Sequence, residues 1–292
     1  MKLFSDSLPF YKANFHCHTT MSDGHLTPAE CMRFYHERGY EVLSITDHRS
    51  VTIPCDPPEG LLMIPGLELD YADSLNCAHI LGLNVRADIE EKWKRGTPPQ
   101  ETIDLIHSCG GTAILAHPAW SLNSPQFLMS LAHVDGVEIY NSVSTLPTNA
   151  DRADSSNLLD IAWSSGLTLW PVLGNDDSHQ YYPEGGVAAT MIQAAEKTPE
   201  SLLAALRNGA VYATQGPRFR QIEIIGEEVV VTCSPVHAVV FCSNLTYTAG
   251  RVVLGSNLTR ASYRIKASER FLRIELHDET GKRAWSTPIA LR

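Results

Sequence analysis

Alternation of strand-like and helix-like segments is the feature of this sequence that most restricts its fold. Through the first two-thirds of the chain, apolar runs with the length of buried strands recur at residues 14–17, 42–46, 62–68, 78–83, 113–116, 136–140, 168–173 and 187–193. Helix-start signals stand between several of them, at Thr27, Thr97 and Thr198, each followed by a proline suited to a first helical turn. Such alternation forms βαβ units around a parallel sheet, so we expect an α/β fold.

The pattern changes near Gly216. From there to the end of the chain, short alternating runs separated by Gly, Asn and Asp turns replace the helical segments, at residues 221–225, 229–232, 238–242, 263–267 and 272–276. This pattern is typical of a small all-β sandwich. We therefore expect two domains, residues 1–216 and residues 217–292, and a chain of 292 residues is long enough for both.

Composition excludes several classes of protein. A formal net charge of -10 argues against a general nucleic-acid-binding surface, although bound cations can still attract a small anionic substrate. The seven cysteines are scattered and form no C-x-x-C pair, so we expect reduced thiols rather than disulfides or a zinc-thiolate site. Residues 1–15 contain no long apolar stretch, which predicts no signal peptide, no membrane helix and a cytoplasmic location.

Histidines and carboxylates gather around the ends of the predicted strands. His16 and His18 lie two apart on the first strand and therefore share a face. Further candidates are near strand ends or in the loops beside them: Asp23, His48, Glu68, His79, His117, Asp177 and His179. Active sites of parallel α/β sheets and barrels collect at the C-terminal ends of strands, and imidazole with carboxylate suits Mn, Fe or Zn ions.

The other histidines receive no role. A single histidine is more often a core or surface residue than a ligand. This interpretation covers His36, His107, His133, His237 and His277.

The motifs resemble those of the polymerase-and-histidinol-phosphatase (PHP) superfamily. They are His16-Cys-His-Thr-Thr-Met-Ser-Asp-Gly, Thr46-Asp-His, Pro65-Gly-Leu-Glu, His79-Ile-Leu-Gly, Leu115-Ala-His-Pro and Asp177-Ser-His, in family order within residues 10–217. The resemblance implies a distorted (β/α)7, TIM-like barrel with two to three divalent ions. It assigns one ion to His16, His18, Glu68 and Asp177, a second to Glu68, His79 and His117, and a third to Asp23, His48 and His179. The C-terminal part resembles the small β-domain of bacterial members, for which we expect capping or oligomerisation.

Hydrolysis of a small phosphate ester is the function that this resemblance implies. A hydroxide bridging the ions would attack the phosphorus of a phosphomonoester, nucleotide or cyclic phosphate, while His179 or a bound water protonates the leaving group. We also expect catalytic roles for Asp177 and Arg49. Arg49 either binds the substrate phosphate through its planar fork or forms a surface ion pair with Asp56 or Glu59.

Two alternatives stay open. The same site could hydrolyse a carboxylic or carbamic ester, because hydroxide also attacks a carbonyl carbon. The chain could instead be a non-catalytic metal-binding scaffold, although the complete ligand set argues against this. Chain length excludes a polymerase, and the added β-domain fits poorly with histidinol phosphatase itself. Asn141 is a candidate for orienting substrate or water, and Trp120 for walling the pocket.

Overall fold

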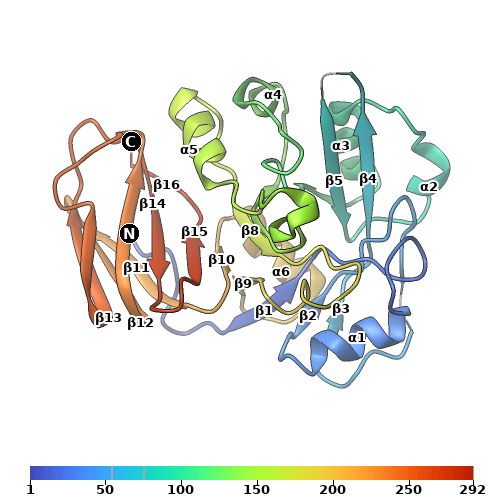
Figure 1. Cartoon of the computed structure of the whole chain (residues 1–292), viewed down its shortest axis with the longest axis horizontal. Coiled ribbons are helices and arrows are strands. Elements are labelled where there is room, and N and C mark those ends of the chain that lie inside the picture. The colour runs from blue at the N-terminus through green and yellow to red at the C-terminus, as the bar shows by residue number, and fades with distance from the viewer. Residues whose placement is uncertain (54, 75, 292) are drawn as a thin grey trace.

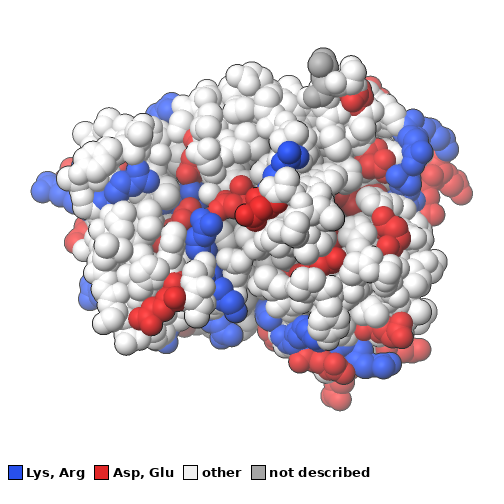
Figure 2. Space-filling model, viewed as in Figure 1, with Lys and Arg blue, Asp and Glu red and all other residues white. Residues whose placement is uncertain are grey.

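The computed structural model describes residues 1–53, 55–74 and 76–291, and it shows a mixed α/β part beside a strand-rich part (Figure 1). Among the described residues the α-helices all precede residue 208: α1 (Pro28–His36), α2 (Ile89–Lys92), α3 (Pro99–Ser108), α4 (Pro125–Met129), α5 (Ser156–Ser165) and α6 (Pro199–Arg207). Every described helix is too short or too polar to span a bilayer. Acidic and basic side chains are interspersed over the face seen in Figure 2.

Two of the three predicted helix starts are correct in detail. Thr27 caps α1 in a capping box with Glu30, and Thr198 caps α6 by accepting a hydrogen bond from the backbone N–H of Ser201. Thr97 does not cap α3, because its hydroxyl donates to the carbonyl of Lys94 instead. The proline-rich start of α3 therefore relies on the fixed backbone of proline rather than on a side-chain cap.

Strands of the α/β part belong to two sheets. The first contains β1 (Phe10–Asn14), β2 (Val42–Leu43), β3 (Leu62–Met63) and β9 (Ala189–Gln193). The second contains β4 (Gly66–Ala72), β5 (Cys77–Leu83), β6 (Thr112–Leu115), β7 (Gly136–Asn141) and β8 (Val172–Asn175). β1 ends at Asn14, so His16 and His18 follow the strand rather than lie on it as predicted.

The two sheets contain antiparallel as well as parallel strand pairs. β1–β2, β2–β3, β6–β7 and β7–β8 are parallel, whereas β4–β5 and β5–β6 are antiparallel. The connection between β4 and β5 is too short for the crossover that parallel strands require. Two isolated bridges connect segments of the two sheets: His48 pairs with Glu68, and Cys17 pairs with Ser178. A closed (β/α)7 barrel therefore stays a prediction.

The strand-rich part continues the first of these sheets. It contains β10 (Val211–Thr214), β11 (Phe219–Ile225), β12 (Glu228–Ser243), β13 (Val252–Arg264), β14 (Phe271–His277), β15 (Arg283–Ser286) and β16 (Ile289–Ala290). These strands belong to one eleven-stranded sheet with β1, β2, β3 and β9, and the small β-sandwich stays a prediction. The predicted runs 229–232 and 238–242 are both within β12, whose pairing with β13 shifts register between Thr232 and Ala238.

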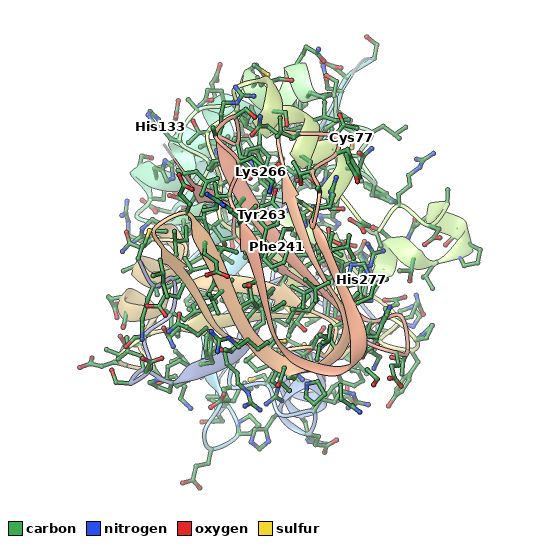
Figure 3. The ribbon with its side chains drawn as sticks, turned by 90° about the vertical axis from the view of Figure 1, so that its left-hand side faces the viewer. Cys77, His133, Phe241, Tyr263, Lys266 and His277 are labelled. Atoms are coloured by element: carbon green, nitrogen blue, oxygen red, sulfur yellow. The ribbon has the colours of Figure 1, made fainter. Side chains whose placement is uncertain are left out.

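Packing between the two parts is extensive. β10 pairs with β15, and Trp285 of β15 stacks on Tyr140 of β7 with ring centroids 5.1 Å apart. The buried guanidinium of Arg273 on β14 binds Asp160 of α5, with Nη2 2.7 Å from Oδ2. Figure 3 looks onto the strand-rich part, where Phe241 and Tyr263 stack across β12 and β13. The division into residues 1–216 and 217–292, whose last residue lies outside the described residues, stays a prediction.

Candidate metal centre

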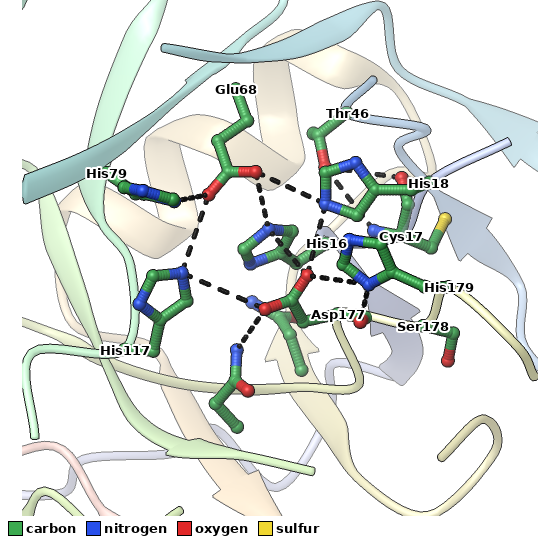
Figure 4. Close-up of polar contacts among 12 residues, drawn as sticks. His16, Cys17, His18, Thr46, Glu68, His79, His117, Asp177, Ser178 and His179 are labelled. Carbon is green, nitrogen blue, oxygen red and sulfur yellow. Dashed lines mark hydrogen bonds and ion pairs between the residues drawn. The ribbon is translucent and has the colours of Figure 1, made fainter. Parts of the chain in front are cut away.

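The residues predicted as metal ligands converge in the structure, and Figure 4 shows those that surround Glu68 and Asp177. Their nitrogen and oxygen atoms form three groups, each with atoms within 4.8 Å of one another, that could hold a metal ion: His16, His18, Glu68 and Asp177; Glu68, His79 and His117; and His18, Asp23, His48 and His179. The grouping is the one that the resemblance implied, with His18 added to the third group. Among the described residues, none of the groups draws on the strand-rich part beyond residue 217.

The first group is closed to solvent. Nε2 of His16 lies 3.3 Å from Oε2 of Glu68 and 3.1 Å from Oδ1 of Asp177. Nε2 of His18 lies 3.2 Å and 3.1 Å from the same two oxygens. Both imidazoles are fully buried, and the carboxylates are nearly so. Two nitrogens and two oxygens therefore face one point inside the protein (Figure 4).

Glu68 links the first group to the second. Its Oε1, the oxygen not used by His16 and His18, lies 2.8 Å from Nδ1 of His79 and 3.4 Å from Nε2 of His117. One carboxylate thus presents a separate oxygen to each group. A carboxylate can bridge two ions in this way, whereas a neutral imidazole such as His18, which belongs to two groups, has one unprotonated nitrogen and can hold one ion only.

The third group is looser and lies nearer to solvent. The carboxylate of Asp23 is 54% exposed, and its oxygens lie 3.6 Å from Nδ1 of His18 and from Nε2 of His179, and 3.7 Å from Nε2 of His48. These atoms are too far apart for hydrogen bonds but are spaced for a shared ion. This group forms the outer edge of the site.

Unpartnered nitrogens test whether the site fits a metal. Within the described chain, Nε2 of His16 and Nδ1 of His48 are buried and have no hydrogen-bond partner. Leaving a buried polar atom unpaired costs free energy, and native proteins rarely do so without a reason. Both nitrogens face the carboxylate of Glu68. A divalent cation would accept the lone pair of Nε2 of His16 and neutralise the carboxylates, so the donor set of the first group fits.

A pocket of about 390 Å³ opens onto these groups. Its lining consists of Asp23, His48, Glu68, His79, His117, Trp120, Val143, Asn149, Asp177, His179, Gln180 and Glu184. Trp120 lines the pocket as the sequence suggested. Val143 and Asn149 come from the 3₁₀ turns η1 (Val143–Thr145) and η2 (Pro147–Asn149).

Solved structures with a similar arrangement show which fold this is. A two-domain protein from Bacteroides vulgatus that contains a predicted PHP-like metal-dependent phosphoesterase matches 94% of this chain and 92% of its own, with a TM-score of 0.57 and 15% identity. The fold is PHP-like. The lesion-specific endonuclease from Pyrococcus furiosus matches 68% of this chain, with a TM-score of 0.52 and 18% identity, but this chain spans only 56% of that enzyme.

Sequence comparison adds two partial relatives of this PHP-like chain. An uncharacterised protein of Methanocaldococcus jannaschii is 29% identical over 151 residues, which are 45% of this chain and 82% of the relative. A 5'-3' exoribonuclease of Haemophilus influenzae is 34% identical over 79 residues, 25% of this chain and 28% of that enzyme. The match thus spans about a quarter of the exoribonuclease. No family model matches the chain.

In the PHP-like site, the pKa values of the histidines and of the carboxylates depend on one another. Burial alone would lower the pKa of His18, but hydrogen bonds with Asp177 and Glu68 raise the pKa to about 9. Burial opposes a similar rise at His79, where Glu68 raises the pKa to about 10. Burial would raise the pKa of Glu68 and of Asp177, yet the neighbouring histidines hold both below their usual range. Without ions, protons on the imidazoles balance the carboxylates, and metal ions would displace those protons.

Glu138 supports the site from behind, and the sequence analysis missed it. This buried residue of β7 accepts hydrogen bonds from Nδ1 of His16, the backbone N–H of His117 and the side-chain amides of Asn141 and Asn175, at 2.8–2.9 Å. A ligating histidine commonly donates its second ring nitrogen to such a carboxylate. The signal for Glu138 was an acid inside an apolar strand.

Two further buried carboxylates hold the ligand loops. Asp47 accepts hydrogen bonds from the backbone and hydroxyl of Thr19 and from the hydroxyl of Ser22, which fixes the segment that leads to Asp23. Asp176 accepts from the hydroxyl of Ser142 and from backbone N–H groups of residues 186–188, which fixes the chain next to Asp177. Burial raises the pKa of Asp176. The loops are therefore tied down before any ion binds.

Two candidate ligands have left-handed backbone conformations. The φ angles are 25° at His117 and 55° at Asp177. This region disfavours residues with a Cβ by roughly 1–2 kcal/mol. Glu138 accepts the backbone N–H of His117, and the carbonyl of His16 accepts that of Asp177. These contacts hold both residues at the ends of β6 and β8, with their side chains in the site.

Arg49 and Asn141 take positions that the sequence did not specify. Nε of Arg49 lies 2.6 Å from Oδ1 of Asp70, so the ion-pair partner is Asp70 rather than Asp56 or Glu59. Arg49 is not among the residues that line the pocket. The side-chain amide of Asn141 donates to Oδ2 of Asp177 at 3.2 Å and thereby orients a candidate ligand directly.

Proposed function

We propose that this chain is a metal-dependent phosphoesterase that hydrolyses a small phosphate ester at the pocket beside Glu68. The observation that carries the proposal is the position of Glu68, whose two oxygens face two separate ligand groups. When bound there, two or three divalent ions (Mn, Fe or Zn) would activate a water and neutralise charge on the phosphoryl oxygens. Adjacent ligand groups suit the clamping of an attacking and a leaving oxygen.

In this proposal, residues of the chain orient the reaction. Asn141 and Glu138 fix Asp177 and His16, so that these ligands need not rearrange during turnover. Nδ1 of His179 lies 2.9 Å from the backbone carbonyl of Asp177, which can only accept, so Nδ1 carries the proton. Nε2 of His179 is then free to hold an ion, and it can protonate a leaving group only when the ring is charged.

The barrel architecture and the domain that holds the metal site are also proposals. We propose that the seven strands β1, β2 and β4–β8 act as a distorted (β/α)7 barrel, joined by the bridges at His48–Glu68 and Cys17–Ser178. We assign the metal site to residues 1–216. The strand-rich part then supports the site through α5 and β7 rather than through ligands.

A nucleic acid is the second candidate substrate. The partial relatives include an exoribonuclease, and the structural neighbours include an endonuclease, which favour a phosphodiester. The net charge of -10 and the interspersed charges in Figure 2 favour a small substrate instead. A carbamic or carboxylic ester is a third possibility for the same ligand set.

One experiment separates these substrates. Protein loaded with manganese is offered phosphomonoesters, cyclic phosphodiesters, short single-stranded RNA and DNA, and carbamate esters, and a His16→Ala variant serves as the control. We expect phosphate release from monoesters by the wild type only. Cleavage confined to oligonucleotides would replace the small substrate with nucleic acid, and cleavage confined to carbamates would overturn the phosphoesterase.

A further inference from the structure

The pocket lining combines the ligand groups with uncharged side chains. Beside the ligand groups, the lining includes Trp120, Val143, Asn149 and Gln180. Among the residues that the structure describes, no lysine or arginine lines the pocket. A phosphate bound at the ligand groups would therefore rely on the ions for its positive partner. A second anionic group on the substrate would find no lysine or arginine in the described lining.

Trp120 presents an aromatic surface directly beside the second ligand group. Its ring centroid lies 4.9 Å from that of His117 and 5.7 Å from that of His79. The indole N–H donates to Oδ1 of Asn149 at 3.0 Å, which fixes the ring. An organic group attached to a phosphate at this end of the site would run along a fixed aromatic surface.

Charged residues near the pocket do not alter this picture. The Arg49 guanidinium is held by Asp70 and lies outside the lining. Glu184 lines the pocket, and its carboxylate accepts hydrogen bonds from the backbone N–H groups of His179 and Gln180. An acidic side chain in the lining disfavours a second anion on the substrate.

We infer that the substrate is a phosphate monoester whose organic group is flat and uncharged and packs against Trp120, and that a second anion on that group weakens binding. This inference rests on the proposed phosphoesterase function. A pocket of about 390 Å³ has room for an aryl or nucleoside-sized group. Aromatic contact with Trp120 supplies the preference for a flat group.

Binding of three phosphonates to the metal-loaded protein tests the inference without turnover. Phenylphosphonate carries a flat neutral group, methylphosphonate lacks it, and 4-carboxyphenylphosphonate adds one anion at its far end. We expect phenylphosphonate to bind about tenfold more tightly than methylphosphonate, a difference of roughly 1.4 kcal/mol. We expect the added carboxylate to weaken binding severalfold. Isothermal titration calorimetry measures all three.

Substitutions at Trp120 test whether this residue causes the preference for the phenyl group. Trp120→Ala should abolish most of the advantage of the phenyl group at unchanged metal content, and Trp120→Phe should keep most of it. Tyr247→Ala removes an exposed aromatic ring of the strand-rich part and should leave the three affinities unchanged. Tighter binding of the carboxylated ligand, or equal binding of phenyl and methyl ligands by the wild type, would overturn the inference. Failure of the proposed function would appear separately, as no hydrolysis of any phosphate ester despite phosphonate binding.

Discussion

Glu138 accepts a hydrogen bond from Nδ1 of His16 at 2.9 Å, and this contact decides which ring nitrogen faces the ligand group. Burial opposes the shift, but the neighbouring His16 holds the pKa of Glu138 below its usual range, so the carboxylate is ionised and can only accept. Nδ1 of a neutral His16 must then carry the proton. Nε2 keeps its lone pair and points between Glu68 and Asp177.

A Glu138→Gln substitution should reverse this arrangement. Three other donors surround the carboxylate, from His117, Asn141 and Asn175, and only His16 can become an acceptor, by changing tautomer. The new amide N–H₂ should therefore face His16 and move its proton to Nε2. We expect metal affinity to fall by about tenfold to a hundredfold. Nitrogen-15 NMR of the protein loaded with diamagnetic zinc reports which nitrogen of His16 carries the proton, and an unchanged His16 spectrum would contradict the mechanism.

Stability of the metal-free protein should be greatest in mildly acidic solution. His18 and His79 have folded-state pKa values of about 9 and about 10 against an ordinary 6.5, so their contribution is complete below 6.5 and is lost as pH rises toward 10. Glu68 and Asp177 have lowered pKa values, so their contribution is lost as pH falls below their ordinary values of 4.5 and 3.8.

Thermal unfolding across this pH range checks the sign. Chelator-treated protein should lose stability from pH 6.5 upward, and metal-loaded protein should not, because ions replace the imidazole protons. A metal-free protein whose melting temperature rises between pH 7 and pH 9 would show that the imidazoles are not charged at neutral pH.

Arg49 should matter for activity only if it leaves Asp70 when substrate binds. In that case Arg49→Ala lowers kcat/KM by roughly tenfold to a thousandfold at unchanged metal content, and Arg49→Lys restores part of the loss. The ion pair with Asp70 predicts near-normal kinetics and a stability change below about 1 kcal/mol. Arg264→Ala, which breaks an exposed pair with Glu227, is the matched control.

Metal content should depend on Glu68 more than on any outer ligand. Wild-type protein made with manganese or iron should carry about two to three ions. Glu68→Ala removes an oxygen from two groups and should leave about one ion or fewer, whereas Asp23→Ala should cost only the outermost ion. Elemental analysis of the three proteins decides this, and equal losses in both variants would refute the shared role of Glu68.

Asp160 should stabilise the junction of the two parts without touching the metal site. Asp160→Ala leaves the buried Arg273 with Glu275 as its remaining partner, so we expect a loss of roughly 2–3 kcal/mol in unfolding free energy. Glu227→Ala on the exposed surface should change it by less than about 0.5 kcal/mol. Chemical denaturation measures both, and unchanged stability of the Asp160 variant would argue for independent domains.

The sequence identified the residues of the three groups better than it identified the strands. His48, Glu68 and His117 were recognisable because each follows an apolar run at a spacing that metal sites use, and the structure brings all of them together. Glu138 gave no comparable signal, because one acid in one strand does not reveal that four donors from distant segments meet it. Hydrogen-bond partners of that kind are set by tertiary packing.

Topology was predicted less completely. The register shifts inside β12 made one long strand look like two short ones, and β10 (Val211–Thr214) was not predicted at all. The pairing of β10 with both β9 and β15 joins the two parts into one sheet. Nothing in the local sequence of Val211–Thr214 specifies those distant partners.

The left-handed backbone conformations of His117 and Asp177 lower the stability of the fold, although the side chains of these residues suit metal binding. Glycine and asparagine adopt this conformation more easily, so either would suit the backbone better while removing a ligand. A descendant of this chain that no longer needed ions would gain stability by changing these two positions. Inactive lineages should therefore drift first at His117 and Asp177, while Glu138, held by four donors, changes later.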